Sequence, residues 1–195
     1  MAAAAALGGC AGGRGETARR LPADATASLR YVALGDSTVE GVGATSAATT
    51  YVGQLHRRLQ VLYPGARVDN LGVGDATSAD VLERQLERAV ARAPQLVTLS
   101  IGPNDITTHV PVARYERNVA AIFARLTRAT SAVVVANLLP DLAVTPRFRA
   151  HEAKPVVARL TVEFNEALRA RRACTARSSW TSTVRARRRC PFGRN

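Results

Sequence analysis

Apolar residues follow two alternating spacings along this chain from residue 29 onward. Short aliphatic runs are typical of buried strands, and longer segments with apolar residues every three or four positions are typical of amphipathic helices. The predicted strands cover residues 30–34, 67–71, 96–101 and 132–137. The predicted helices cover residues 49–63, 78–93, 112–129 and 152–171.

Local signals support the ends of these helices. The first stops before Pro64-Gly65, and Ser78 can cap the second, which ends before Pro94. The apolar face of the third helix consists of Tyr115, Val119, Ile122 and Leu126. That of the last consists of Val156, Leu160, Phe164 and Leu168.

Strands that alternate with helices of this length predict a parallel sheet with helices on both faces. In such folds the ligand site lies at the carboxyl ends of the strands. Three polar clusters follow the first three predicted strands, at Ser37, at residues 72–77 and at Asn104. We therefore expect these clusters to meet at one edge of the sheet.

Composition favours a single domain, and the net charge is less informative than it first looks. The 195 residues are 47% hydrophobic, which is enough for one core, and carry a formal charge of +12. Nine of the 27 basic residues lie in residues 169–195, a segment without acidic residues, so the remaining chain is almost balanced. We therefore expect no nucleic-acid partner for the folded body, and an Arg-rich tail that binds nucleic acid or an anionic surface is the competing interpretation.

The two ends of the chain differ in composition from its middle. Residues 1–28 form an Ala/Gly-rich leader in which Leu7 to Cys10 resembles a lipobox, so Cys10 is a candidate lipidation site. This interpretation implies export as a lipoprotein, and the alternative is an unstructured leader on a cytoplasmic protein. No run approaches the roughly 18 apolar residues that cross a membrane. Three cysteines, an odd number, support neither a disulfide framework nor a metal site.

Two short motifs carry the candidate chemistry. Gly35-Asp36-Ser37 follows the first predicted strand, and Gly102-Pro103-Asn104-Asp105 follows the third. Either alone is a plausible turn. Together with Asn70-Leu71-Gly72 leading to Thr77, they resemble the SGNH (GDSL-type) hydrolases, a family of serine esterases, lipases and acyl hydrolases. The resemblance covers residues 30 to about 170.

The resemblance implies a fold and a mechanism. The fold would be a flavodoxin-like three-layer α/β/α sandwich spanning residues 29–171, with its fifth strand missing or distorted. Ser37 would attack a small ester or thioester substrate, without metal or cofactor. The oxyanion donors would be the N–H of Ser37, the amide of Asn104, and a backbone N–H of Asp75, or of Gly74 if the loop is one residue shorter. A bare amide or N–H stabilises an oxyanion without a charge to desolvate.

The chain departs from the family pattern in its general base. The family's Asp-x-x-His motif is absent, and the remaining histidines are weak substitutes. We expect His56 on a solvated helix surface, His109 in a loop near the active edge, and His151 in an Arg-rich loop. Asp141 is interpreted as a loop acid. A serine without a base is a poor nucleophile, so we predict very low esterase activity, or a non-catalytic module that binds ligand in the same pocket.

Residues 172–195 read as an out-of-frame tail. Residues 177–183 can be written CGG TCG TCG TGG ACC TCT ACG, and reading from the third base gives Val-Val-Val-Asp-Leu-Tyr, a credible buried strand. We therefore favour a frameshift over a genuine basic tail. Resequencing the gene around codon 172 tests this hypothesis, which fails if the frame is intact.

Overall fold

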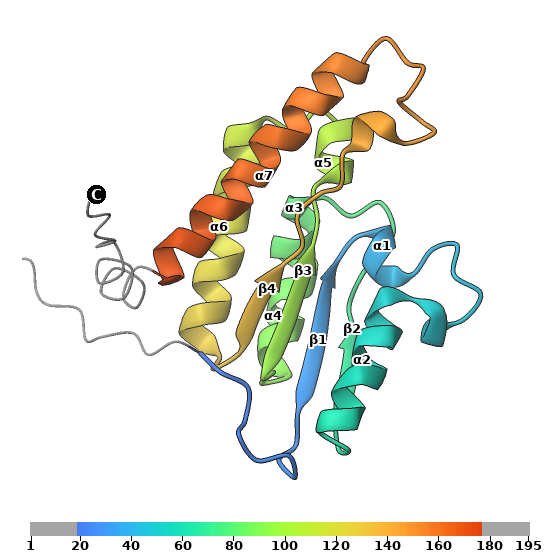
Figure 1. Ribbon diagram of the computed structural model, residues 1–195. Coiled ribbons are helices and arrows are strands. Elements are labelled where there is room, and N and C mark those ends of the chain that lie inside the picture. The colour runs from blue at the N-terminus through green and yellow to red at the C-terminus, as the bar shows by residue number, and fades with distance from the viewer. Residues whose placement is uncertain (1–18, 177–195) are drawn as a thin grey trace, which may run out of the picture.

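Four parallel strands form the centre of the computed structural model, which describes residues 19–176 (Figure 1). They lie in the order β2-β1-β3-β4. All four predicted strands are confirmed: β1 (Arg30–Gly35), β2 (Arg67–Asn70), β3 (Leu96–Ser100) and β4 (Val133–Ala136). Within the described residues the sheet contains no fifth strand, and β4 lies at its edge.

Helices cover both faces of this sheet, which gives the predicted three-layer α/β/α fold (Figure 1). Along β1 the side chains alternate: Tyr31 and Ala33 pack towards α2, whereas Val32 and Leu34 pack towards the helices of the opposite face. This period of two is what a strand buried on both faces requires. The helices of the chain are α1 (Ser37–Glu40), α2 (Tyr51–Leu62), α3 (Ser78–Asp80), α4 (Leu86–Ala91), α5 (Pro103–Thr107), α6 (Val112–Ala129) and α7 (Lys154–Ala176). Short 3-10 turns form η1 (Ala47–Thr49) and η3 (Leu142–Val144), and a π-helical turn forms η2 (Val81–Gln85).

The predicted helices are present, with two corrections. Ser78 is not the cap of the second helix: Thr77 caps α3, and Ser78 is the buried first residue. In α7 the predicted apolar face starts one residue too early, because Val156 is exposed and Val157 is buried. A buried Thr161, whose hydroxyl donates to the Val157 carbonyl at 2.8 Å, continues the face towards Phe164. Because Thr161 is polar, the sequence pattern did not include it in the apolar face, and the face was predicted one residue out of position.

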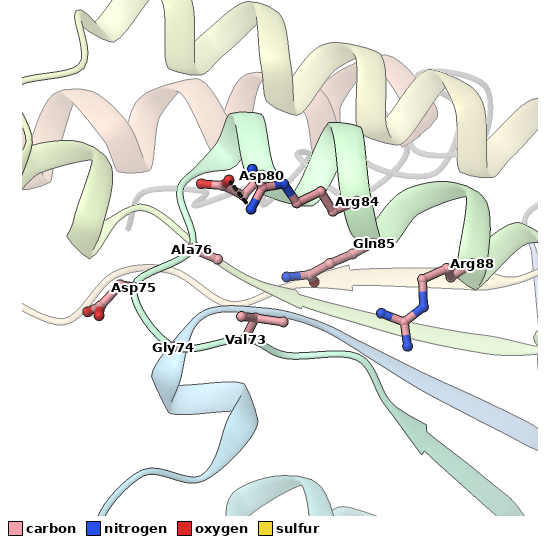
Figure 2. Close-up of a pocket in the computed structure, with 8 residues that line it drawn as sticks. All are labelled: Val73, Gly74, Asp75, Ala76, Asp80, Arg84, Gln85 and Arg88. Atoms are coloured by element: carbon pink, nitrogen blue, oxygen red, sulfur yellow. Dashed lines mark ion pairs between the residues drawn. The ribbon is translucent and has the colours of Figure 1, made fainter.

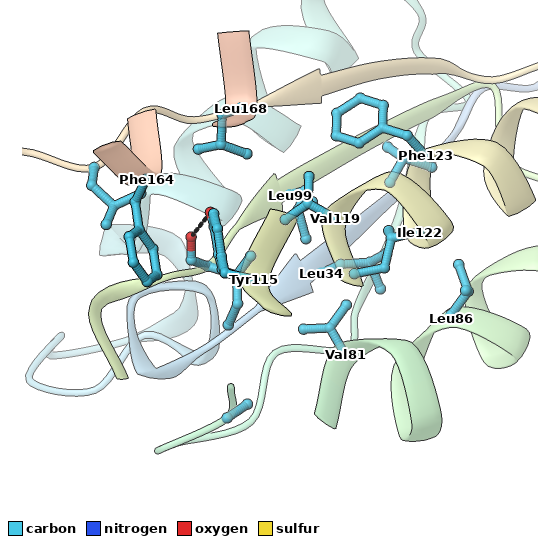
Figure 3. Packing of buried hydrophobic residues seen from close by; sticks show 14 of the residues in the cluster. Leu34, Val81, Leu86, Leu99, Tyr115, Val119, Ile122, Phe123, Phe164 and Leu168 are labelled. Carbon is cyan, nitrogen blue, oxygen red and sulfur yellow. Dashed lines mark hydrogen bonds between the residues drawn. The ribbon is translucent and has the colours of Figure 1, made fainter. Parts of the chain in front are cut away.

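The larger core lies between the sheet and α6 and α7 (Figure 3). Tyr115 of α6 stacks on Phe164 of α7 with ring centroids 4.2 Å apart, and its hydroxyl donates to the Ile101 carbonyl at 2.9 Å. This bond ties α6 to the chain just beyond β3, where Asn104 follows. No helix within residues 19–176 is both long and apolar enough to span a membrane.

Candidate active site

The end of β1 places Ser37 at the start of a helix. Asp36 caps α1, because its Oδ1 atom accepts a hydrogen bond from the Thr38 N–H at 2.9 Å. Ser37 is therefore the first helical residue, half-buried, and within the described chain its own N–H has no hydrogen-bond partner. An unpaired N–H at a helix start is a suitable donor to an anion.

Gly35 allows β1 to lie unusually close to β3. Its φ is +147°, and a Cβ there would lie 1.9 Å from the Ser100 carbonyl oxygen. The side-chain amide of Gln85 pairs with the same residue, accepting from the Gly35 N–H at 2.9 Å and donating to the Gly35 carbonyl at 2.8 Å. Gln85 is buried in η2, and sequence reasoning missed it. The available signal was a polar side chain at the 81-85-89 spacing of an otherwise buried helix face.

The loop after β2 lies beside the Ser37 turn. The Val73 N–H donates to the Gly35 carbonyl at 3.1 Å, and the Gly72 N–H is occupied by the Asn70 side chain at 3.0 Å. Among the residues that the structure describes, the N–H groups of Gly74 and Asp75 have no partner. Asp75 has a φ of +58°, the left-handed region that favours glycine.

Asn104 joins this loop through its side chain. Its Nδ2 atom donates to the Ala76 carbonyl at 3.0 Å, which occupies one of the two N–H bonds of the amide. The three clusters that follow β1, β2 and β3 therefore lie at one end of the sheet, where Figure 1 shows α1, α3 and α5 together.

Two pockets flank these loops. One, of about 370 Å³, contains the nucleophile candidate and is lined by Ser37, Thr38, Gly41, Val42, Ala44, Thr50 and Tyr51. The other, of about 260 Å³, lies between the β2–α3 loop and the helix that follows, and is lined by Val73, Gly74, Asp75, Ala76, Asp80, Arg84, Gln85 and Arg88 (Figure 2). Gly74 and Asp75 thus line the second pocket and not that of Ser37, and Asn104 lines neither.

A buried polar group lies behind the nucleophile turn. Asp36 is 1% exposed, and within residues 19–176 neither its Oδ2 atom nor the buried hydroxyl of Tyr51 forms a hydrogen bond. Burial raises the pKa of Asp36 and that of Tyr51, since neither charged form is solvated there. Tyr31 and Thr98 complete the group through a hydroxyl–hydroxyl bond of 2.8 Å. No local pattern in the sequence points to Tyr51, because its proximity to Asp36 arises only on folding.

None of the chain's three histidines lines either pocket. His56 is partly buried and its Nε2 atom contacts the Ala66 carbonyl at 3.0 Å, so its predicted solvated position was wrong. His109 and His151 are exposed, and the His151 Nδ1 atom accepts from the Ala153 N–H. Asp141 is a loop acid that caps η3.

Other predicted features lie wholly or partly outside the described residues. Cys10 falls outside residues 19–176, as do residues 177–195 of the tail predicted for 172–195, whereas residues 172–176 belong to α7. In that described range, no group of three or more His, Cys, Asp or Glu side chains could hold a metal ion.

Comparison with known proteins decides the family. The model of the GDSL-like lipase/acylhydrolase family matches residues 33–175. The chain belongs to this family. Lipase 2 of Streptomyces coelicolor (strain ATCC BAA-471 / A3(2) / M145) is 36% identical over an alignment of 107 positions that covers 48% of this chain and 36% of that protein. The chain therefore spans about a third of the length of this curated relative.

Solved structures share this fold. TesA superposes with a TM-score of 0.59 at 25% identity, covering 75% of this chain and 74% of its own. The psychrotrophic esterase EstA from Pseudoalteromonas sp. gives a TM-score of 0.55 at 20% identity, with 74% of each chain covered. The family predicted from the three motifs after the first three strands is confirmed by the match over residues 33–175.

Proposed function

We propose that this GDSL-like protein hydrolyses a carboxylic ester or thioester through an acyl intermediate on Ser37. The observation that carries the proposal is the unpaired N–H of Ser37 at the start of α1, beside loops that hold further unpaired donors. These donors are the second N–H of Asn104 and the backbone N–H of Gly74 or Asp75. Preorganised N–H groups of this kind stabilise the oxyanion of a tetrahedral intermediate.

The reaction would run in two steps. The Ser37 Oγ atom bonds to the carbonyl carbon, the C–O or C–S bond to the leaving group breaks, and the leaving alcohol or thiol takes up the proton that the Ser37 hydroxyl loses. Water then attacks the acyl-serine, releases the carboxylic acid and restores the hydroxyl. The chain's own residues supply the nucleophile and the donors, so we propose no metal or cofactor.

Turnover is proposed to be slow, because none of the three histidines lines the pocket that contains Ser37. Without a positioned base the serine hydroxyl keeps its proton, and catalysis is limited to what the donors and binding provide. That contribution alone exceeds the uncatalysed rate by about 10³- to 10⁴-fold in serine proteases, which leaves a measurable activity.

The substrate is proposed to be small and uncharged near the ester. The Ser37 pocket is lined mainly by small residues such as Gly41 and Ala44, together with Tyr51. None of the residues that line it carries an ionised side chain. The names of the relatives, a lipase and an esterase, agree with an ester substrate.

The decisive experiment compares hydrolysis of p-nitrophenyl butyrate by the full chain and by two serine variants. We expect slow turnover that Ser37→Ala abolishes and that Ser131→Ala leaves unchanged, since Ser131 is exposed in the loop before β4. The esterase EstA was solved inhibited by monoethylphosphonate, so phosphonate labelling detected by mass spectrometry gives a second measure of Ser37 reactivity. Turnover that survives Ser37→Ala contradicts the proposal.

The same experiment addresses the non-catalytic alternative, which the absence of a histidine from the pocket favours. A binding module would show neither turnover nor labelling. It would still bind an unreactive ester analogue such as butyramide with equal affinity in the wild type and in Ser37→Ala.

A further inference from the structure

A hydrogen-bond network with two fully buried members, Asp105 and Ser78, and a partly buried one, Asn118, lies beneath the loop that holds the candidate oxyanion donors. Asp105 and Ser78 are both 0% exposed. The Ser78 N–H faces both carboxylate oxygens of Asp105, at 3.1 and 2.9 Å, and the Ser78 hydroxyl donates to Oδ1 at 2.5 Å. Asn118 of α6 donates from Nδ2 to the Ser78 hydroxyl oxygen at 2.9 Å, so every polar atom of the serine has a partner.

This network is not an ordinary helix cap. Asp105 lies in the first turn of α5, whereas the groups it accepts from belong to the start of α3, 27 residues earlier. A carboxyl here is energetically unfavourable, and burial raises the pKa of Asp105 despite the bonds from Ser78. A buried ionisable group that joins two separate loops holds their relative position more strictly than apolar packing would.

The two loops joined in this way are those that carry the donors. Asn104 is bonded to Ala76, and the next residue, Asp105, is bonded to Ser78. Two successive residues of the turn after β3 are therefore hydrogen-bonded to the loop after β2. Asn104 lies in the candidate site, and Asp105 lies beneath it. Gly74 and Asp75, whose N–H groups are unpaired among the described residues, come directly before Ala76, the first of these hydrogen-bonded residues.

We propose that Asp105 is a positioning residue, which acts through Ser78 and Asn118 to fix the separation between the Asn104 amide and the Gly74–Asp75 N–H groups. The proposal rests on the proposed function. It assigns Asp105 no contact with substrate. Small displacements of oriented groups lower rates by about a hundredfold, and loss of one oxyanion donor by about 10²- to 10³-fold.

The test is Asp105→Asn, assayed with p-nitrophenyl butyrate in the full chain. The isosteric amide keeps one acceptor for Ser78 but turns an NH₂ group towards the Ser78 N–H. We expect kcat to fall at least about tenfold while KM stays within about threefold, because the loops shift but the substrate pocket at Ser37 does not. Asp69→Asn is the matched control, since Asp69 forms only half-exposed ion pairs with Arg30 and Arg92, and it should leave both constants unchanged.

Asn118→Ala is a second variant in case Asp105→Asn does not fold. It removes only the donor to the Ser78 hydroxyl, and we expect a smaller fall in kcat, about threefold, again without change in KM. Far-UV circular dichroism establishes that each assayed variant is folded.

The outcomes separate the two proposals. If Ser37→Ala abolishes turnover but folded Asp105→Asn and Asn118→Ala keep the wild-type kcat, the positioning role is overturned and the proposed function stands. A change in KM with kcat unchanged also overturns the positioning role. A wild type without turnover or phosphonate labelling at Ser37 overturns the proposed function, and the positioning role with it.

Discussion

Three consecutive residues at the end of β1 each meet a different physical requirement. Gly35 provides the close approach to β3, Asp36 caps α1, and Ser37 presents a hydroxyl and a free N–H at the helix start. The sequence predicted Ser37 because a strand followed by Gly-Asp-Ser is a local pattern. It could not predict that Gln85, 50 residues after Gly35, and Tyr51, 15 residues after Asp36, come close to this turn on folding.

Gly35→Ala should destabilise the fold severely. The added Cβ would lie 1.9 Å from the Ser100 carbonyl oxygen and 2.6 Å from a Val39 methyl carbon, at a φ that alanine rarely adopts. We expect a loss of more than about 3 kcal/mol in the free energy of unfolding, or no folded protein. Urea denaturation measures it. Gly65→Ala is the control, because a Cβ there meets nothing within 4 Å, and a comparable loss at both sites would contradict the argument.

Asp36→Asn should change how stability depends on pH. Burial raises the pKa of Asp36 in the folded protein above its value in the unfolded chain, so the folded state holds this proton to higher pH. The stability of the wild type relative to the variant is therefore greatest below pH 4 and is lost as pH rises through the folded pKa. The difference is measured from the melting temperatures of the wild type and the variant between pH 4 and 8. Asparagine still provides an oxygen that accepts from the Thr38 N–H.

Asp24→Asn provides a control of opposite sign. Hydrogen bonds from Thr26 lower the pKa of this exposed carboxyl, so its contribution is present at neutral pH and is lost on acidification. The same slope for both variants would show that the pH dependence does not arise from the burial of Asp36.

At the scale of elements, prediction succeeded where one period runs unbroken. The bounds of α6 were predicted to the residue, because its apolar positions repeat without interruption from Tyr115 to Leu126. Prediction failed between residues 77 and 91, where α3, a π-helical turn and α4 follow one another. In this segment Gln85 and Ser78 are both buried. From the sequence, a glutamine is expected on the surface and a serine at this position is expected to be a helix cap.

Phe164→Ala tests the contact between α6 and α7. Phe164 is 0% exposed and stacks on Tyr115, so its removal leaves a cavity between the two helices. We expect a loss of about 3–5 kcal/mol in the free energy of unfolding. Val162→Ala, on the exposed side of the same helix at 55% exposure, should change it by less than about 0.5 kcal/mol. Equal effects at both positions would show that α7 does not pack as described.

At the scale of the molecule, two apolar clusters share one sheet. Val52 belongs to the cluster on the α2 face, and Phe164 to the larger cluster on the opposite face. The sequence predicted two covered faces, because its short aliphatic runs alternate with amphipathic helices. The charge pattern also predicted an almost neutral folded domain, because a segment with nine arginines and no acidic residue is confined to residues 169–195.

Because β1 and β3 contribute to both clusters, the domain should unfold in one transition. Val52→Ala and Phe164→Ala lie on opposite faces, and each should lower the urea midpoint without changing the slope m. Far-UV and near-UV circular dichroism should give the same midpoint for each variant. Two separated transitions in either variant would mean that the faces are independent.

The π-helical turn η2 has a consequence for the evolution of this site. A π turn holds one residue more than an α-helical turn, and it lies between Ser78 and α4. Deleting one residue there would restore a regular helix and rotate α3 by about 100° relative to α4. Ser78 would then leave Asp105, or Gln85 would leave Gly35. A single-codon deletion in this segment is therefore incompatible with keeping both bonds.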